Sequence, residues 1–236
     1  MEPHSVPGRP EGAPVVRSYG TSFTADEDPL SEGGLWINGR NEGVDWANIL
    51  TRGGLAQGEM IPLVVRERRA EQGDEIDIPV GDYNDPTAIL KGAWGRNQHA
   101  RARVFTRNQN AKYYHEVELR LRSTLVPHAI PGYEVFFRCL KADGGYAEIV
   151  KWLGPLGGWQ SLCRKDGPEF GVKDGDIIDA TIIGNEIKGY INGEEVTSAT
   201  DDSYPEGNPG IGFNYGAEET YVDHGFTHYE VETWND

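Results

Sequence analysis

The second half of the chain alternates apolar and polar residues with a period of two. The alternation runs through HARARVF (99–105), YYHEVELRLRS (113–123), YEVFFRCL (133–140), YAEIVKWL (146–153), DIIDATII (176–183) and IKGYI (187–191). Because successive side chains of a strand point to opposite faces, this period predicts strands with one apolar and one polar face. Asn192-Gly193 provides the two positive-φ positions of a tight hairpin turn, and residues 207–216 and 223–232 supply two closing strands. The predicted fold class is all-β.

The first half of the chain is less regular and holds two segments that stand apart. Residues 1–20 contain four prolines and three glycines with few apolar residues, which predicts an extended arm instead of a packed element. The arm is either a free tail or is held by its own domain or by an assembly partner. Residues 59–81 pass from an apolar cluster through the charged stretch RERRAEQGDE to IDIPV. This order predicts a β-hairpin-like excursion with a solvated tip, with a short helix at 66–72 as the competing interpretation. Residues 21–236 otherwise form one predicted domain.

The composition fits an all-β fold and limits the classes of binding partner that we expect. Of the 236 residues, 31 are glycine and 14 are proline, which suits many short strands joined by turns. The formal net charge of −16 repels phosphate backbones and anionic membranes, so we expect neither nucleic acid nor a membrane as a partner. Solubility explains the charge, with a cationic ligand as the alternative. No run approaches the ~18 apolar residues of a membrane span, and the first residues lack the pattern of a secretory signal.

Two cysteines, Cys139 and Cys163, each lie in an apolar strand-like segment. We expect free thiols there, with a disulfide as the alternative if the two strands are neighbours. The sequence contains neither a CxxC motif nor a Cys/His zinc spacing, so no zinc site is expected.

Four segments carry a resemblance to a known superfamily. They are SFTADEDPLSEGGLW (22–36), DGDIIDATIIGNEIKGYINGEEV (174–196), DDSYPEGNPGIGF (201–213) and DHGFTHYEVE (223–232). Their order resembles that of concanavalin A-like lectins and glucanases, including laminin G-like and phage minor-tail domains. The resemblance implies a two-sheet antiparallel β-sandwich, the jelly roll, and says little about activity. It also implies a structural calcium ion held by the first and last strands, for which Asp26 and Asp223 are the candidates; the alternative is that both cap turns.

One polar strand face gives the candidate glycan site. In residues 113–123 the apolar side chains of Val117, Leu119 and Leu121 belong in the core. The charged residues that alternate with them share the other face of the strand, and the first of these is Glu116. In the resembling superfamily the concave side binds sugars, and carboxylates and guanidinium groups suit glycans because each holds two hydroxyls. With the neighbouring strands at 133–140 and 146–153, the charged candidates are Glu118, Arg120, Arg122, Glu134, Arg138 and Glu148. The alternative is a solvated sheet face stabilised by cross-strand ion pairs.

Flat aromatic side chains decide whether such a face binds sugar, because pyranose rings stack on them. Trp152, Trp159 and Tyr215 sit at strand ends or beside glycine-rich loops, where such platforms project. For each of them core packing is the competing interpretation. Trp36 and Trp46 are expected in the core.

Two enzymatic alternatives follow from partial motifs. A polysaccharide lyase that eliminates across a uronate needs a base and a group that neutralises the carboxylate, and Tyr215, His99 and Arg120 are of these types. The strand ELRLR resembles that of alginate-lyase jelly rolls only in part, because the first arginine of their pattern is missing.

A glycoside hydrolase is less favoured. GDEIDIPV resembles the catalytic strand of laminarinases at Glu75 and Asp77 but lacks the third carboxylate.

The lack of a complete catalytic set favours a non-catalytic glycan-binding or surface-interaction module. The implied fold, the acidic surface and the proline-rich arm suggest a component of a larger assembly, such as a virion decoration or tail protein or a secreted complex. The expected location is extracellular or on a virion surface. A purely structural decoration role is the third possibility, and an occluded polar face would favour it over glycan binding.

Overall fold

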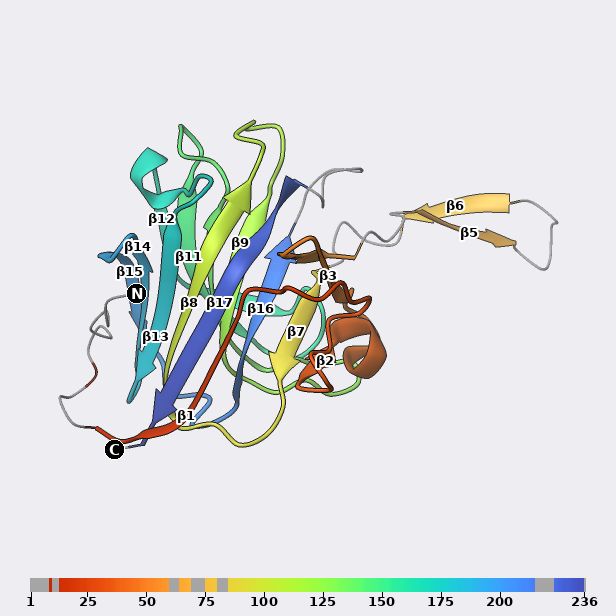
Figure 1. The fold of residues 1–236 in the computed structure, drawn as a ribbon. Coiled ribbons are helices and arrows are strands. Elements are labelled where there is room, and N and C mark those ends of the chain that lie inside the picture. The colour runs from red at the N-terminus through yellow and green to blue at the C-terminus, as the bar shows by residue number, and fades with distance from the viewer. Residues whose placement is uncertain are drawn as a thin grey trace.

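Strands form nearly all of the regular structure in the described part of the chain. The computed structural model describes residue 9 and residues 13–59, 64–68, 75–79, 85–214 and 223–235. Within those ranges there are seventeen strands, a short π-helix, η1 (Gly39–Gly43), and a 3-10 helix, η2 (Pro168–Phe170). Two large antiparallel sheets stack face to face (Figure 1). The predicted all-β, two-sheet sandwich is confirmed.

The seven-stranded sheet carries the charged strand face predicted from the sequence. Its strands follow the order β12-β11-β10-β9-β16-β7-β2, and each neighbouring pair is antiparallel. Their bounds are β2 (Trp36–Asn38), β7 (Thr87–Leu90), β9 (Glu116–Ser123), β10 (Gly132–Arg138), β11 (Tyr146–Trp152), β12 (Trp159–Asp166) and β16 (Asn208–Asn214). The strands predicted at 113–123, 133–140 and 146–153 are therefore consecutive neighbours, β9, β10 and β11.

The eight-stranded sheet closes the other side of the sandwich. Its strands follow the order β15-β14-β13-β8-β17-β4-β3, and β1 also pairs with β17. Their bounds are β1 (Val15–Thr21), β3 (Ile49–Arg52), β4 (Leu55–Gly58), β8 (Asn97–Thr106), β13 (Ile177–Ile183), β14 (Glu186–Ile191), β15 (Glu194–Thr200) and β17 (His224–Trp234). The predicted turn at Asn192-Gly193 joins β14 to β15, and both of its residues have positive φ, 53° and 86°.

The main core lies between the two sheets. On β9 the side chains of Val117, Leu119 and Leu121 point into it and are fully buried, and Ala100 and Ala102 of β8 join the same cluster from the other sheet. Removing this apolar surface from water is the main favourable contribution to folding of the sandwich. The predicted inward face of residues 113–123 is confirmed.

A second apolar cluster covers the outer face of the seven-stranded sheet. Trp46 and Trp152 lie at its centre with their rings 6.2 Å apart, and Leu125 and Ile130 pack with them. Trp46 follows η1, whereas Leu125 and Ile130 belong to the connection between β9 and β10, so two segments outside the sheet fold over it. The alternative of a solvated charged face is therefore wrong, because every residue of β9 and β10 is buried.

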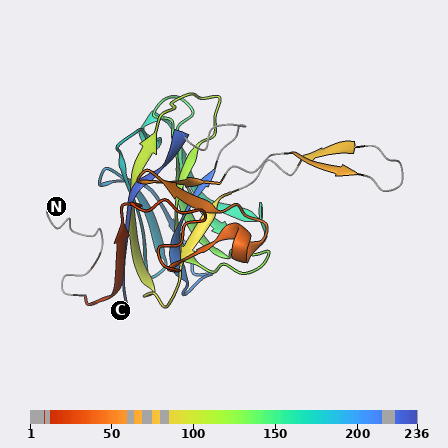
Figure 2. The ribbon, with the colours of Figure 1, turned by 45° about the vertical axis from the view of Figure 1, so that its right-hand side comes forward.

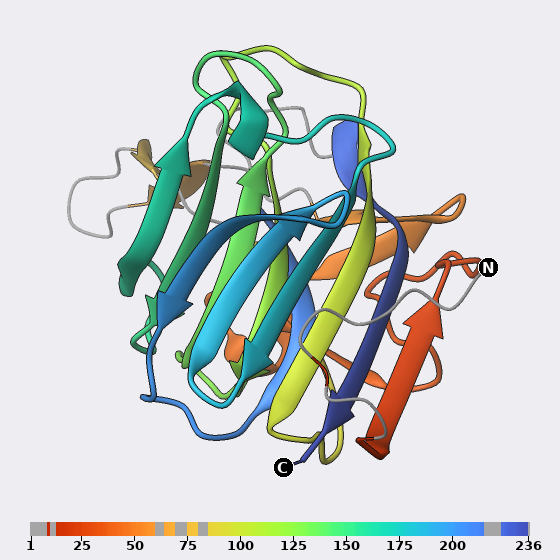
Figure 3. The same ribbon diagram turned by 90° about the vertical axis from the view of Figure 1, so that its left-hand side faces the viewer.

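The two ends of the described chain lie side by side. β1 pairs antiparallel with β17 along the edge of the eight-stranded sheet (Figure 3). The predicted boundary of the arm at residue 20 is therefore too late, because residues 15–20 belong to a strand of the sandwich. Arg9 forms an ion pair with Glu232 at 2.9 Å and lies 5.9 Å from the centre of the Trp234 ring. At this residue the arm contacts its own domain.

The segment predicted as an excursion, 59–81, contains a hairpin. β5 (Val64–Arg68) and β6 (Glu75–Pro79) pair antiparallel as a two-stranded sheet of their own (Figure 2). The competing helical interpretation is wrong for residues 66–68, which are strand. Glu75 and Asp77, the partial hydrolase motif, lie on β6 and so belong to neither large sheet.

Both cysteines are free thiols, as predicted. Cys139 is buried beyond the end of β10, and Cys163 on β12 is half-buried opposite Ile149 of β11. Within the described ranges, no helix has the length and apolar character needed to cross a membrane.

Candidate functional site

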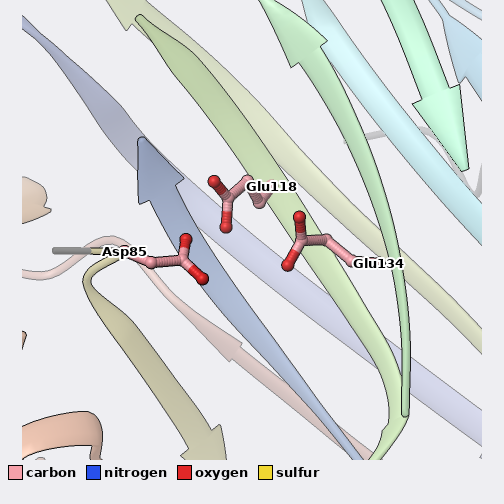
Figure 4. Close-up of side chains that lie close together, drawn as sticks. All are labelled: Asp85, Glu118 and Glu134. Atoms are coloured by element: carbon pink, nitrogen blue, oxygen red, sulfur yellow. The ribbon is translucent and has the colours of Figure 1, made fainter. Parts of the chain in front are cut away.

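Three carboxylates meet on the outer face of the seven-stranded sheet. Glu118 comes from β9, Glu134 from β10 and Asp85 from the segment just before β7 (Figure 4). An oxygen of each lies within 4.8 Å of an oxygen of the others, and all three side chains are buried. Strand alternation places the glutamates here, because Glu118 follows the inward-facing Val117 and Glu134 follows the inward-facing Tyr133. We refer to these three side chains as the carboxylate cluster.

Arg120, also on β9, lies within the cluster and is completely buried. Its Nη2 atom is 2.7 Å from Glu134 Oε2, 3.0 Å from Asp85 Oδ2 and 3.6 Å from Glu118 Oε2. The Trp152 indole N–H donates a hydrogen bond to Glu134 Oε2 at 3.0 Å, and the guanidinium lies 5.1 Å from the centre of the Trp152 ring. The guanidinium therefore takes the position that a metal ion would take among three carboxylates.

The cluster contains more acidic groups than cations. Three carboxylates share one guanidinium, so full ionisation would leave two negative charges uncompensated in a buried site. Burial raises the pKa of Glu134 to about 8. Burial, together with the charges of Glu134 and Asp85, raises the pKa of Glu118 well above its ordinary value, and burial raises the pKa of Asp85 in spite of Arg120. The cluster therefore retains protons at neutral pH.

Glu116 extends the charged face along β9. One of its oxygens accepts a hydrogen bond from the Tyr146 hydroxyl, and the other accepts one from the Asn214 side-chain amide at 2.7 Å. Burial raises the pKa of Glu116 to about 7 although both hydrogen bonds oppose the shift, and the charges of Asp85 and Glu148 add to it. Glu116 is therefore a further acid that exchanges its proton near neutral pH.

A small pocket opens onto these groups. It is lined by Asp85, Glu116, Glu118, Glu134, Phe136, Val150, Trp152, Trp159 and Asn214. The pocket is small, and the space inside it admits at least one ordered water molecule. Trp159, at the start of β12, is the exposed member of the lining, with 39% of its surface accessible. We refer to this site as the carboxylate pocket; it joins buried acids to an aromatic side chain at the surface.

Gly212 on β16 makes room for the Glu118 side chain. A methyl group built on Gly212 would lie 2.1 Å from Glu118 Oε2 and 3.3 Å from Arg120 Nε. Glycine inside a strand commonly marks such a close approach of another group. Glycine is therefore needed at position 212 to leave space for the Glu118 side chain, and not because of the backbone conformation of β16.

The Gly212→Ala variant tests this requirement. We expect it to lower the free energy of unfolding by about 1–3 kcal/mol, because the added methyl group forces Glu118 and Arg120 to move. Urea denaturation gives the measurement. Gly20→Ala on β1 is the matched control, since a methyl group there has its nearest neighbour at an ordinary 3.7 Å. Equal losses in the two variants would contradict the assignment.

Solved structures share this architecture, whereas no family model and no curated protein matches the sequence. The carbohydrate-binding module CBM66 of Bacillus subtilis has a TM-score of 0.53 and 13% identity, covering 88% of this chain and 98% of that one. The κ-carrageenase of Pseudoalteromonas carrageenovora, in complex with a κ-carrageenan oligotetrasaccharide, has a TM-score of 0.52 and 13% identity, covering 99% of both chains. The endo-β-1,3-glucanase of Pyrococcus furiosus has a TM-score of 0.52 and 11% identity, covering 92% and 93%.

These matches and the order of the strands decide the architecture. The chain has a jelly-roll fold of the concanavalin A-like kind. The resemblance found in the sequence is thereby confirmed at the level of fold. At identities of 11–13% the likeness carries no residue role from one protein to another, so the function has to be argued from this site.

The jelly roll brings five of the predicted glycan-site residues together. Glu118, Glu134, Trp152 and Trp159 line the carboxylate pocket, and Arg120 pairs with its carboxylates. Trp152 is nevertheless buried in the second apolar cluster, whereas Trp159 is partly exposed at the surface. Glycan binding by these residues stays a prediction.

Glu148 stands apart from that group. Glu148 on β11 is buried on the same sheet face, where its Oε2 atom accepts a hydrogen bond from Arg164 Nη1 at 2.9 Å. The Arg164 guanidinium in turn lies 3.8 Å from the centre of the Tyr146 ring. Glu148 therefore belongs to an ion pair beside the pocket. Tyr215 lies outside the described residues, and its place at the site stays a prediction.

Arg122 does not share the face of Arg120, contrary to the prediction from alternation. Its φ is +43°, outside the strand region, so the alternation ends at this residue. The guanidinium donates hydrogen bonds to the backbone carbonyls of Arg96, Gly184 and Tyr204, at 2.7, 2.8 and 3.1 Å. Buried carbonyls require such donors. Arg122 thus holds three connecting segments together instead of lining a glycan site.

The Arg138 side chain also hydrogen-bonds to backbone carbonyls. Its guanidinium donates hydrogen bonds to the carbonyls of Gly144, Ala111 and Tyr113, at 2.7, 2.8 and 3.0 Å. These carbonyls belong to the loops before β9 and after β10. The predicted glycan contact of Arg138 is replaced by a structural role, because the side chain is buried against the loops it holds.

The residues of the lyase interpretation do not converge. His99 lies on β8 of the eight-stranded sheet, with its Nε2 atom 2.7 Å from Asp179 Oδ1, whereas Arg120 lies on β9 of the other sheet. Both point away from the main core, because their neighbours Ala100 and Leu119 point into it. The core therefore separates His99 from Arg120, and the predicted pairing of the two in one active site is wrong.

The predicted calcium ligands, Asp26 and Asp223, each accept a hydrogen bond from a backbone amide, and calcium binding by them stays a prediction. Asp26 Oδ1 accepts a hydrogen bond from the Gly53 amide at 2.7 Å, which matches the alternative role of a turn cap. The backbone carbonyl of Asp223 accepts one from the Arg107 amide at 2.8 Å. Among the described residues, the carboxylate cluster is the group of acidic side chains close enough to share an ion, and it contains neither aspartate.

The sequence pattern did not single out Asp85, Asn214 or Gly212. Asp85 stands in a turn-like stretch before a short strand, where nothing local distinguishes it. Asn214 and Gly212 belong to GNPGIGFNYG, which we interpreted only as a closing strand. Two glycines two positions apart in a strand, Gly210 and Gly212, leave one sheet face without side chains, and this spacing is the signal that points to a close approach there.

Proposed function

We propose that the protein is a non-catalytic glycan-binding module that binds its ligand at the carboxylate pocket. The proposal rests on the juxtaposition of the exposed Trp159 with buried carboxylates in one pocket. A sugar ring stacked on Trp159 would bring a hydroxyl to the pocket beside it. Carboxylates are strong acceptors for such a hydroxyl. The names of the similar solved structures, a carbohydrate-binding module, a glucanase and a carrageenase, support a glycan as the ligand.

The same geometry favours binding over cleavage. A retaining glycosidase holds its two carboxyl groups about 5 Å apart on either side of the bond that it breaks. Oxygens of Glu118 and Glu134 lie within 4.8 Å, which makes glycoside hydrolysis the second candidate. Both carboxylates are, however, buried and paired with Arg120, so they are not free to act on the two sides of a glycosidic bond.

Trp159→Ala is expected to weaken glycan binding by about tenfold, because it removes the stacking surface and leaves the carboxylates in place. Isothermal titration calorimetry with the tightest ligand from a glycan array measures the change. Val16→Ala is the control, since Val16 is an exposed apolar side chain on the other sheet. Unchanged affinity in Trp159→Ala would place the glycan elsewhere on the protein.

A glycan array and an assay for released reducing ends distinguish a glycan-binding module, a glycoside hydrolase and a structural protein. Saccharide affinity without release of new reducing ends is the expected result. Reducing ends released by the native protein but not by Glu134→Gln would establish hydrolysis. The lack of any saccharide affinity would reject the proposal in favour of a structural role, which burial of the charged face makes a serious competitor. The extracellular or virion location and an assembly partner for residues 1–20 stay predictions.

A further inference from the structure

The titratable side chains that line the carboxylate pocket are all acidic. They are Asp85, Glu116, Glu118 and Glu134. In the described part of the chain, neither a lysine nor an arginine lines the pocket. A uronate or sulfate group of a ligand would therefore enter the pocket without a cation in the lining to compensate its charge, which is unfavourable in a partly buried site.

The sequence on either side of two lining residues adds further acidic groups. Asp85 directly follows VGDYN (80–84), and Asn214 directly precedes YGAEETYV (215–222). Neither segment contains a lysine or an arginine, and together they contain three acidic residues, Asp82, Glu218 and Glu219. The two chain segments that continue from the lining therefore supply no cation for an anionic ligand.

Two arginines on the same sheet face already have carboxylate partners. Arg120 is completely buried, and its Nη2 atom lies within 3.6 Å of all three carboxylates of the cluster. Arg164 lies 2.9 Å from Glu148 Oε2 and 2.9 Å from Asp166 Oδ1. An anionic ligand would gain either guanidinium only in exchange for an existing ion pair, so the exchange brings no net compensation of charge.

The acids of the pocket suit a neutral ligand, because they both donate and accept hydrogen bonds. Burial raises the pKa of Glu116 to about 7 and that of Glu134 to about 8. A protonated carboxyl donates one hydrogen bond and accepts others, and a sugar hydroxyl does the same. When these carboxyls release their protons they still accept from a hydroxyl, whereas an anionic group then meets additional negative charge.

We infer that the carboxylate pocket selects neutral glycans over glycans that carry uronate or sulfate groups. This inference rests on the proposed function and specifies its ligand class. It also bears on the lyase interpretation, which requires a cation to neutralise the carboxylate of a uronate. Arg120 was the candidate for that role, but it is shared among the carboxylates of the cluster.

The first test compares glycans that differ only in charge. A glycan array pairs neutral oligosaccharides with anionic counterparts of equal length, such as β-1,4-linked glucose with glucuronate and β-1,4-linked mannose with mannuronate. Pairs that bind are titrated into the native protein by calorimetry at pH 8.5. We expect the neutral member to bind at least about tenfold more tightly, the effect of one like-charge contact near a protein surface.

Two results of this comparison would contradict the proposals separately. Equal or tighter binding of the anionic members would overturn the inference and leave the proposed function standing. If no glycan on the array binds, neutral or anionic, the proposed function fails as well.

The preference of the native protein for the neutral member should increase between pH 6 and pH 9. Glu116 and Glu134 release protons in this range, whereas a uronate is ionised throughout, so repulsion grows for the uronate alone. The other two acids of the carboxylate cluster also have raised pKa values and add negative charge in the same direction, while Arg120 and Arg164 keep their charge. His115, next to Glu116 in the sequence, is uncharged here because burial lowers its pKa to about 4. A preference that stays constant or falls would contradict the inference.

A matched pair of variants separates the pocket from the net charge of −16, which also repels anions. Glu116→Gln removes one acid of the lining, and we expect it to reduce the preference for the neutral member at pH 8.5 by about threefold or more. Glu194→Gln removes a carboxyl from the exposed β15 and should leave the preference unchanged. Equal reductions in the two variants would show that net charge governs the selection, and would overturn the inference. Thermal unfolding verifies that both variants are folded.

Discussion

Replacing Arg120 by methionine is expected to lower the free energy of unfolding by about 3–5 kcal/mol at pH 8, the cost of removing one partner from a buried ion-pair network. Arg120 is completely buried, and its Nη2 atom lies 2.7 Å from Glu134 Oε2 and 3.0 Å from Asp85 Oδ2. Methionine fills much of the space of the arginine stem but leaves these carboxylates without a cation. Urea denaturation followed by tryptophan fluorescence measures the loss.

The loss caused by Arg120→Met should be much smaller at pH 5. Burial already raises the pKa of Glu134 to about 8 and that of Glu118 well above its ordinary value, so at pH 5 these carboxyls are protonated and need no cation. Arg52→Met is the control, because it breaks an exposed ion pair with Asp28 and should cost less than about 1 kcal/mol at either pH. A loss of the same size at pH 5 and pH 8 would show that Arg120 acts through packing instead of charge.

The strand faces could be predicted from the sequence because alternation is a local property of the backbone. On β9, Leu119 enters the core while Glu118 and Arg120 point to the other side, as the period of two requires. β9, β10 and β11 follow one another in the chain and are neighbours in the sheet, so their charged residues also come together. Strand alternation and strand order were therefore sufficient to predict Glu134 as a residue of the candidate site.

Burial of that face could not be predicted, because it depends on segments distant in the sequence. The alternation of apolar and polar residues predicts to which face of the sheet a side chain points, but it does not predict whether another segment covers that face. Trp46 and the connection that contains Leu125 cover the face from outside the sheet. Asp85 and Asn214 join the site through contacts across 35 and 98 positions of sequence, to Arg120 and Glu116 respectively. No short-range pattern encodes such contacts.

Glu116 gives the protein a pH-dependent contribution to stability that can be isolated in a single variant. Its carboxyl ordinarily has a pKa of 4.5, and burial raises it to about 7 in the folded state. The folded state therefore holds a proton that the unfolded state releases, so the contribution is complete below pH 4.5 and is lost as the pH rises through about 7. A shift of this size corresponds to about 3 kcal/mol.

The free energy of unfolding of Glu116→Gln, relative to that of the native protein, should rise by about 3 kcal/mol between pH 4.5 and pH 8. The difference is the quantity to measure, because burial lowers the pKa of His115 to about 4 and so makes an opposite contribution in the native protein that cancels in the comparison. The glutamine can still hydrogen-bond to Tyr146 and Asn214. Glu194→Gln removes a carboxyl from the exposed edge strand and serves as the control for loss of a surface charge. A difference for Glu116→Gln that does not change with pH would show that this carboxyl stays ionised in the fold, and that the charged face is wetter than its burial indicates.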